Sequence, residues 1–332
     1  MDKAHEATDA LLLEIERKIR QEYSRACREV EAKLQKYLKD FKRKDLQWRA
    51  DVRSGKKTAR EYKDWKIGQL AIGQRWEEMK DSLARDYVNA NNIARSIVLG
   101  YMPEVYALNH NYATYECEKG SLVNTSYTLY SRESVERIMR DNPQMLPLPG
   151  KAVRAAIAQR KAIAWNKQQI QSVMMQAILQ GESIPKIARR LAFAVGDKDY
   201  KHAVTSARTM ATGAQNAGRV DAYKRAEKKG IKVKQQWIAT LDGRTRHEHR
   251  ILDGQMRNPG EPFEVEGYTI RFPGDPQAEG FLVYNCRCTL IGQIEGFERD
   301  VVSYRQIDPK LGDMTYEEWK QAKPVYKKKK KK

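Results

Sequence analysis

The chain has 332 residues, of which 62 are lysine or arginine and 43 are aspartate or glutamate, so its formal net charge is +19. An apolar fraction of 41% beside 32% charged residues favours long exposed helices over one large core, and the length suggests two domains or one domain with a long appendage. No apolar run approaches the ~20 residues that span a bilayer and no signal peptide opens the chain, so we expect no membrane anchor and synthesis in a reducing cytoplasm.

The first forty residues carry the most regular apolar pattern of the chain. Their apolar residues recur at spacings of 3, 4, 4, 3, 4, 4, 3 and 4, an eleven-residue repeat of about 3.67 residues per turn. This pattern predicts a straight helix that buries a narrow stripe, packed against another helix of this chain in preference to a second copy or a partner. The stripe consists of Leu12, Ile15, Ile19, Tyr23, Ala26, Val30, Leu34, Tyr37 and Phe41.

The remainder of the N-terminal half has a less regular pattern. Residues 42–57 break the stripe and predict a basic loop, and apolar spacing predicts a second helical segment over residues 58–99. Residues 100–150 are mixed, with many tyrosines and asparagines, and they end in "NPQMLPLPG", which is typical of a domain boundary.

From Lys151 the spacing of apolar residues again predicts helices. After Gly230 the period of this spacing changes from 3.6 residues to 2. Three stretches then predict strands: residues 231–241, 263–272 and 281–294. The fold class is therefore α+β, a long N-terminal helical region followed by a small C-terminal domain of helices and an antiparallel sheet. The predicted parts are a helical docking region (1–150), this domain (151–295) and a polar tail (296–332).

The polar tail contains one short amphipathic piece, "TYEEWKQA", and ends in a lysine run expected to be disordered. Without this run the net charge is still +13. Such an excess favours a polyanionic partner, because lysine and arginine release counterions from phosphates. The candidate DNA-binding residues are Lys327, Lys328, Lys329, Lys330, Lys331 and Lys332.

Half of the four cysteines lie together in "VYNCRCTL". On a strand, Cys286 and Cys288 would point to the same face, where they can share a metal ion but not form an easy disulfide. His247 and His249 lie one loop away in "TLDGRTRHEHRILDG", with Asp242 or Asp253 as a carboxylate donor. Zinc prefers such cysteine and histidine donors, so a zinc site is one interpretation.

Three other interpretations stay open from the residues alone. The first is a nucleophilic cysteine, although no helix N-terminus follows to lower its pKa. The second is a metal-dependent nuclease, because H-E-H lies near aspartate and arginine in a basic chain. The third is a purely structural polar network, in which Asp242, Arg244, Arg246 and His249 fix a loop onto the sheet.

Beyond these spacings, an ordered set of motifs in the C-terminal half resembles a known protein family. "W-I-A-T-L-D-G-R-T-R-x-x-H-x-x-L-D-G", then "G-E-P-F", "P-G-D-P" and "N-C-R-C-T-L", resembles the C-terminal domain of phage minor head proteins over about residues 165–292. This family is named after protein F of phage Mu and is also called the head morphogenesis family. The resemblance favours His249 over His247. The metal set is then Cys286, Cys288, His249 and Asp242, with Asp253 and His247 as alternative fourth ligands. The structural signature is Thr245, Arg246, Gly254 and Asn285.

The resemblance implies a structural, non-enzymatic minor head protein of a tailed phage. Such proteins are associated with the portal and with packaged double-stranded DNA, and they act in head assembly and in DNA packaging or delivery. The expected location is the virion head near the portal vertex, with several copies per virion, and the host cytoplasm before assembly. Expected partners are the portal protein, the major capsid protein and packaged DNA, and zinc is the one expected cofactor. The alternatives are a metal-dependent nuclease or other nucleic-acid-processing enzyme, and a nucleic-acid-binding protein that acts through its basic tail.

Overall fold

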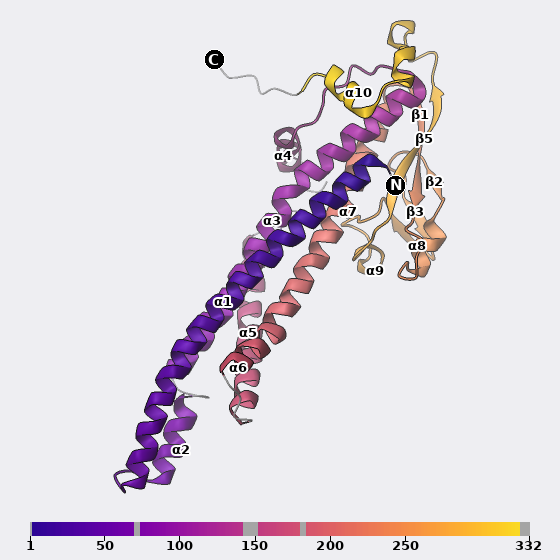
Figure 1. Cartoon of the computed structure of the whole chain (residues 1–332). Coiled ribbons are helices and arrows are strands. Elements are labelled where there is room, and N and C mark those ends of the chain that lie inside the picture. Colours follow the sequence, from indigo (N-terminus) through magenta and orange to yellow (C-terminus); the bar gives the residue numbers. More distant parts are fainter. Residues whose placement is uncertain (1, 70–73, 142–151, 180–183, 326–332) are drawn as a thin grey trace. The chain divides into compact units, whose positions relative to one another are not determined.

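The computed structural model describes residues 2–69, 74–141, 152–179 and 184–325. The chain divides into two compact units. Unit 1 comprises Met1–Ile15, Val98–Leu148 and Thr205–Lys332, and unit 2 comprises Glu16–Ile97 and Pro149–Val204. Figure 1 labels most of the helices and strands.

The predicted fold class is confirmed: helices fill the first two thirds of the chain, and short antiparallel strands follow. The longer helices are α1 (Lys3–Arg53), α2 (Ala59–Ile67), α3 (Gln74–Ser121), α4 (Arg132–Asp141), α5 (Ala152–Leu179), α6 (Ile184–Leu191), a π-helical turn (Ala192–Asp197) and α7 (Lys198–Glu227). The shorter helices are α8 (His247–Leu252), α9 (Gly280–Val283) and α10 (Tyr316–Ala322), with two 3-10 turns at Tyr304–Gln306 and Pro309–Gly312. The strands are β1 (Ile231–Ile238), β2 (Met256–Arg257), β3 (Phe263–Val265), β4 (Tyr268–Ile270) and β5 (Thr289–Phe297).

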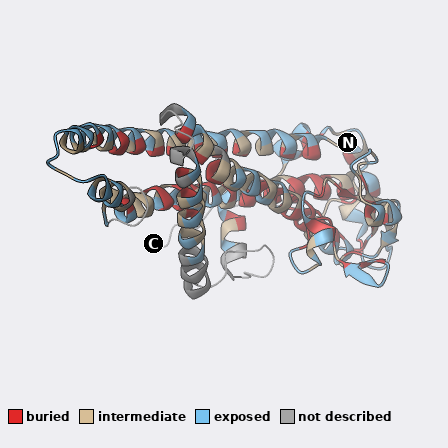
Figure 2. Cartoon of the chain, turned by 90° about the horizontal axis from the view of Figure 1, so that it is seen from below, coloured by how far each residue is buried: buried red, intermediate tan, exposed pale blue. Residues whose placement is uncertain are grey.

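The predicted apolar stripe of α1 is buried within the chain. Ile19, Tyr23, Val30 and Leu34 are each at most 3% exposed, and buried positions recur along the helices between exposed ones (Figure 2). In unit 2 this stripe packs with apolar side chains of α3, α5 and α6 in one cluster. The stripe therefore finds its partner in cis, as the pattern predicted.

The basic loop predicted over residues 42–57 is wrong for most of its length, because α1 continues to Arg53. The stripe continues past Phe41, but Asp45 occupies a buried position in it. The Asp45 carboxylate accepts a hydrogen bond from the Tyr62 hydroxyl (2.6 Å) and pairs with Arg49 (2.9 Å). Because a charged residue occupies this buried position, the helical period cannot be recognised there from apolar residues alone.

Helix α3 extends beyond the predicted end at residue 99 and runs to Ser121, with Pro103 inside it. The expectation of mixed structure is therefore wrong for residues 100–121. This part of α3 buries polar side chains that have hydrogen-bond partners, so it shows no apolar stripe. Asn109 donates to the Thr8 hydroxyl (2.8 Å), and the Tyr127 hydroxyl donates to Asn111 (2.6 Å). The boundary motif "NPQMLPLPG" lies outside the described residues.

Unit 1 contains a three-stranded antiparallel sheet in the order β2-β1-β5, whose strands are labelled in Figure 1. Strand β1 pairs with β5 from Ile231 opposite Phe297 to Ile238 opposite Thr289. Its residues alternate between buried and more exposed, which is the period of 2 that the sequence shows.

Two of the three predicted strands need correction. Residues 263–272 form a hairpin of β3 and β4, because Glu266 (φ 48°) and Gly267 (φ 83°) make a turn between them. Residues 281–294 begin with α9, and strand β5 starts only at Thr289. The cysteines therefore lie in the connection before β5 and not on a strand.

Small residues of α7 allow close backbone contacts on two sides. A Cβ atom on Gly213 would lie 2.6 Å from the carbonyl oxygen of Gly274, in the "PGDP" turn. A Cβ atom on Gly218 would lie 2.6 Å from the carbonyl oxygen of Tyr106 on α3. The alanine- and glycine-rich sequence of this helix is thus explained by packing.

The amphipathic piece near the C-terminus forms α10, whose residue Trp319 is 1% exposed. The lysine run that follows lies outside the described residues. Across the described part of the chain, no helix combines the length and the apolar character needed to cross a bilayer.

Candidate functional site

The connection that carries the two cysteines is held by hydrogen bonds from its neighbours and not by a strand ladder. Asn285 adopts a left-handed conformation (φ 53°) after α9, and its backbone N–H donates to the Thr209 hydroxyl of α7 (3.1 Å). The Thr212 hydroxyl donates to the carbonyl of Cys286 (2.8 Å), and the Thr240 hydroxyl donates to that of Arg287 (3.0 Å). Side chains on both flanks thus replace the missing backbone partners.

His249, Cys286 and Cys288 come together although the strand argument for the cysteines is wrong. One side-chain donor atom from each lies within 4.8 Å of the others, and all three residues are buried. His249 Nδ1 is 3.1 Å from the Cys288 sulfur and 3.6 Å from the Cys286 sulfur. The Trp237 indole of β1 covers His249 edge-on, with ring centroids 6.0 Å apart.

Arg246 determines which ring nitrogen of His249 carries the proton. Its guanidinium contacts His249 Nε2 at 3.2 Å and donates to the carbonyl of Tyr284 at 2.8 Å. A guanidinium can only donate, so Nε2 accepts and the neutral ring holds its proton on Nδ1. From this network we assign the Nδ1–H to a hydrogen bond that it donates to Cys288.

The two thiols are electrostatically unequal. Cys286 hydrogen-bonds to Cys288, which lowers the pKa of Cys288 and raises that of Cys286, with burial opposing the first shift and reinforcing the second. The hydrogen bond from His249 lowers the pKa of Cys288 further. Negative charge in the cluster is therefore favoured on Cys288.

Asp242, the predicted fourth ligand, is engaged elsewhere. Its carboxylate accepts two hydrogen bonds from Arg287 (2.6 and 2.7 Å) and one from the backbone N–H of Arg244 (2.9 Å). The Arg287 guanidinium holds the pKa of this carboxyl well below its usual range. Thr245 donates to the carbonyl of Thr240 and so closes the same turn. Asp242 thus fastens the loop after β1 to the residue between the cysteines.

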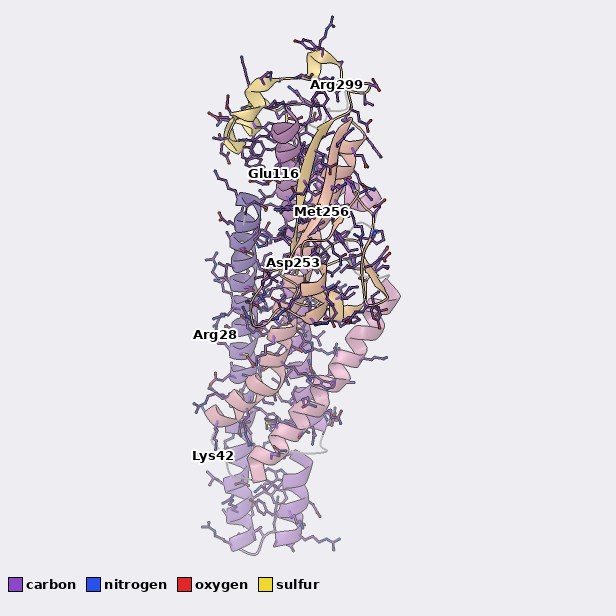
Figure 3. All side chains as sticks on the ribbon, turned by 90° about the vertical axis from the view of Figure 1, so that its right-hand side faces the viewer. Arg28, Lys42, Glu116, Asp253, Met256 and Arg299 are labelled. Atoms are coloured by element: carbon purple, nitrogen blue, oxygen red, sulfur yellow. The ribbon has the colours of Figure 1, made fainter. Side chains whose placement is uncertain are left out.

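The alternative fourth ligands also lie outside the cluster. The Asp253 carboxylate at the end of α8 accepts from the backbone N–H of Ala239 (2.8 Å), and its side chain is labelled in Figure 3. Gly254 follows in a left-handed conformation (φ 78°) and donates to the carbonyl of Trp237 (2.8 Å). His247 is exposed and lies 3.4 Å from Glu266.

The cluster matches zinc in donor type and approximately in spacing. A tetrahedral zinc ion with bonds of about 2.1–2.3 Å holds its donors about 3.6 Å apart, and the two sulfur–nitrogen distances are 3.1 and 3.6 Å. Among the described residues, no carboxylate or second histidine completes the set of four. A metal on Nδ1 would also place the ring proton on Nε2, so Arg246 would have to give up its contact there. Zinc stays a prediction.

The same geometry bears on a nucleophilic cysteine. In a catalytic cysteine–histidine pair, a third group that accepts a hydrogen bond orients the imidazole. Here the group at the far nitrogen of His249 is Arg246, which donates. The arrangement resembles a polar network that holds loops together more than a catalytic triad.

A cavity of about 600 Å³ opens beside the cluster. Residues from the start of α1, from α7 and from both site loops line it: His5, Thr8, Asp9, Leu12, Arg208, Ala211, Thr212, Gln215, Thr240, Arg244, Thr245, Arg246, His249, Asn285, Cys286, Arg287 and Cys288. Four arginines among these side chains make the cavity cationic on balance.

The sequence interpretation missed the buried residue that joins the site to the rest of unit 1. Arg219 of α7 is 0% exposed and donates to Asp2 (2.7 and 2.8 Å), Asn109 (3.1 Å) and the carbonyl of Leu290 (2.8 Å). Asp2 in turn accepts from backbone N–H groups in the first turn of α1. One helical turn earlier, Asn216 receives the N–H of Leu290 (2.9 Å). The only sequence signal was a run of polar residues on an alanine-rich helix.

The sequence of this region matches a known protein family. Residues 168–291 match the model described as "Phage Mu protein F like protein", a span that contains α7, the cysteine pair and His249. The minor head protein GP7 of Bacillus phage SPP1 is 24% identical over 319 residues, which cover 95% of this chain and 94% of that protein.

A second relative shares a shorter region. The NAD(+)–arginine ADP-ribosyltransferase EFV of Enterococcus faecalis (strain ATCC 700802 / V583) is 29% identical over 152 residues. These cover 46% of this chain but only 31% of the transferase. No solved structure gives a significant match. Residues 168–291 thus carry the domain of the phage Mu protein F family, and the chain as a whole is similar to a phage minor head protein.

Proposed function

We propose that this chain is a structural, non-enzymatic component of a tailed-phage head, located in the virion near the portal vertex. It associates there with the portal protein and with packaged double-stranded DNA, and it acts in head assembly and in DNA packaging or delivery. The observation that carries this proposal is the similarity to a minor head protein over 95% of the chain. The net charge of +19 supports the contact with DNA.

The side chains of the site support a structural role. Asp242 is paired with Arg287, and both ring nitrogens of His249 have partners. The Asp242–Arg287 pair and the His249–Cys288 contact each join the segment after β1 to the connection before β5. A group that holds loops together in this way is not poised to abstract a proton from a substrate.

Virion composition tests the proposal. Particles are purified from a producing strain on a density gradient, and their proteins are quantified by mass spectrometry against the portal protein as internal standard. We expect the chain in full heads at several copies per portal, cross-linked to portal peptides by a short amine-reactive reagent. Its absence from purified heads would overturn the proposal.

The alternative is a metal-dependent nuclease. The full chain is incubated with linear duplex DNA and Zn²⁺, Mg²⁺ or Mn²⁺, beside a His249→Ala variant of the same preparation. We expect no cleavage by either protein. Metal-dependent cleavage that the substitution abolishes would establish an enzyme instead.

A further inference from the structure

Unit 2 contains a helical hairpin with a strong excess of basic residues. The hairpin consists of the last three turns of α1, the turn around Gly55 (φ 75°) and α2. Residues 42–66 carry ten lysines or arginines and four acidic residues, a net charge of +6 within 25 residues. We call this segment the basic hairpin.

The acidic groups of the basic hairpin are largely occupied by local partners. Asp45 is 8% exposed and binds Tyr62 and Arg49. Glu61 forms a capping box with Thr58 at the start of α2, accepting from its backbone N–H (2.7 Å). Asp51 accepts from Gln47 (3.2 Å). These carboxylates are held at caps and between the helices, so they neutralise little of the outer surface.

Most of the cations, by contrast, face solvent. In the described part of the chain, six of them are exposed and have no ion pair: Lys42, Lys44, Arg53, Lys56, Arg60 and Lys63. Lys42 and Arg53 share one face of α1 with Arg49, which pairs with Asp45, because seven and then four residues separate the three along the helix. Figure 3 labels Lys42 at this end of α1.

The aromatic residues of the basic hairpin stiffen it. Trp65 stacks with Phe41 (centroids 5.5 Å apart, planes at 3°) and with Trp48 (5.2 Å, 18°). Lys57 covers the Trp48 ring at 3.3 Å. These rings are therefore occupied by each other and are not free to stack on unpaired bases. What the basic hairpin offers to a partner is a fixed row of positive charge.

We propose that the basic hairpin is the surface through which this chain contacts the phosphate backbone of duplex DNA. The row from Lys42 to Arg53 is about 16 Å long, and a duplex carries about ten phosphates over that length. Cations without internal partners on a rigid hairpin suit contacts that depend on charge and not on base sequence. The inference rests on the proposed function, because it assigns a site to the DNA contact.

Three variants of the full chain, each with six fewer positive charges, test this assignment. The first changes the six unpaired cations of the basic hairpin to Gln. The second changes six exposed cations of unit 1 to Gln: Lys229, Lys232, Arg299, Arg305, Lys310 and Lys320. The third lacks residues 327–332. Affinity for a fluorescent 40-base-pair duplex of mixed sequence is measured by anisotropy at several salt concentrations, and circular dichroism checks the helix content of each variant.

The hairpin variant should lose the most affinity, and its slope of log affinity against log salt should fall by about 3–5, since each lost phosphate contact lowers it by about 0.9. The unit 1 variant should change the slope by less than about 1. A smaller variant with only Lys56, Arg60 and Lys63 changed should show about half the full effect.

Equal slopes for the hairpin and unit 1 variants, or a loss confined to the variant without residues 327–332, would overturn the assignment. Neither result would alter the presence of the chain in purified heads, so failure here is separable from failure of the proposed function.

Discussion

The two units of this chain are stabilised by different kinds of interior. Unit 2 buries an apolar and aromatic stripe, and among its described residues only Asp45 and Asn166 are buried polar side chains. Unit 1 buries many more, including Arg219, Asn216 and His249, and each of these three has hydrogen-bond partners. An apolar interior depends on shape and volume, whereas a polar interior depends on every partner being present.

The largest expected effect comes from the centre of the polar interior. Arg219→Met would leave the Asp2 carboxylate without its cation and the carbonyl of Leu290 without its donor. We expect unit 1 to lose about 3–5 kcal/mol of unfolding free energy. Hydrogen exchange of β1 and β5 in urea, read by mass spectrometry, measures this loss separately from unit 2.

The matched control is Arg299→Met, which removes an exposed arginine of the same unit, labelled in Figure 3. It should change stability by less than about 0.5 kcal/mol. A loss below about 1 kcal/mol for Arg219→Met would show that the network around it contributes little.

The apolar interior of unit 2 should lose stability when a substitution leaves a cavity in it. Leu34 is 0% exposed and Leu46 is 61% exposed, and both are leucines of α1. We expect Leu34→Ala to destabilise unit 2 by about 2–5 kcal/mol and Leu46→Ala by less than about 0.5 kcal/mol. Urea unfolding monitored by exchange of α1 residues 16–53 distinguishes them, and equal losses would contradict burial of the stripe.

Zinc binding is tested by composition and by stability. We expect protein purified without chelator to retain about one equivalent of zinc after dialysis, and the Cys286→Ser/Cys288→Ser variant to retain none. At a free zinc concentration 100 times the dissociation constant, unit 1 should gain about 2.7 kcal/mol. Background zinc in the unmodified chain would show that hydrogen bonds alone hold the cluster.

A smaller effect follows from Glu116 of α3, labelled in Figure 3. Burial raises the pKa of Glu116 to about 7, and nearby Asp2 adds to the shift while Arg219 opposes it. A carboxyl whose pKa is raised by folding adds stability below its unfolded pKa of about 4.5, and that stability is lost as the pH rises through about 7. We expect this loss of unfolding free energy to be about 1–2 kcal/mol, since the side chain is partly exposed and solvent screens its charge.

The difference between the unmodified chain and Glu116→Gln isolates this carboxyl. Burial lowers the pKa of His5 in the same region, so His5 acts in the opposite sense, but it is present in both proteins. Unfolding of unit 1 measured from pH 5 to 8 should show the variant gaining stability relative to the unmodified chain as the pH rises. Parallel curves would contradict the raised pKa.

The sequence predicted the apolar half of this architecture well. The stripe from Ile15 to Tyr37 is buried along α1, and the change of period after Gly230 marks the start of the sheet. The motifs around His249 and Cys288 also contain the three residues that come together in the cluster. Each of these signals is local, because neighbouring residues on one face of a helix or strand share one environment.

The predictions that were wrong concern groups whose partners lie far away in the chain. Asp45 hid the continuation of α1 because its carboxylate accepts a hydrogen bond from Tyr62. Thr212 and Thr240 replace the ladder bonds that would have extended β5 over the cysteines. No spacing rule anticipates such a partner, since a hydrogen bond depends on position in space.

By itself, then, the sequence determined the helical and antiparallel elements, the buried stripe and the residues of the family signature. Only the tertiary structure decided that Arg219 joins Asp2 across 217 positions, and that Arg246 holds the proton of His249 on the side of Cys288. Hydrophobic burial is non-directional and leaves a periodic trace in the chain. Polar pairing is directional and leaves none, so it is found only where the folded chain brings donor and acceptor together.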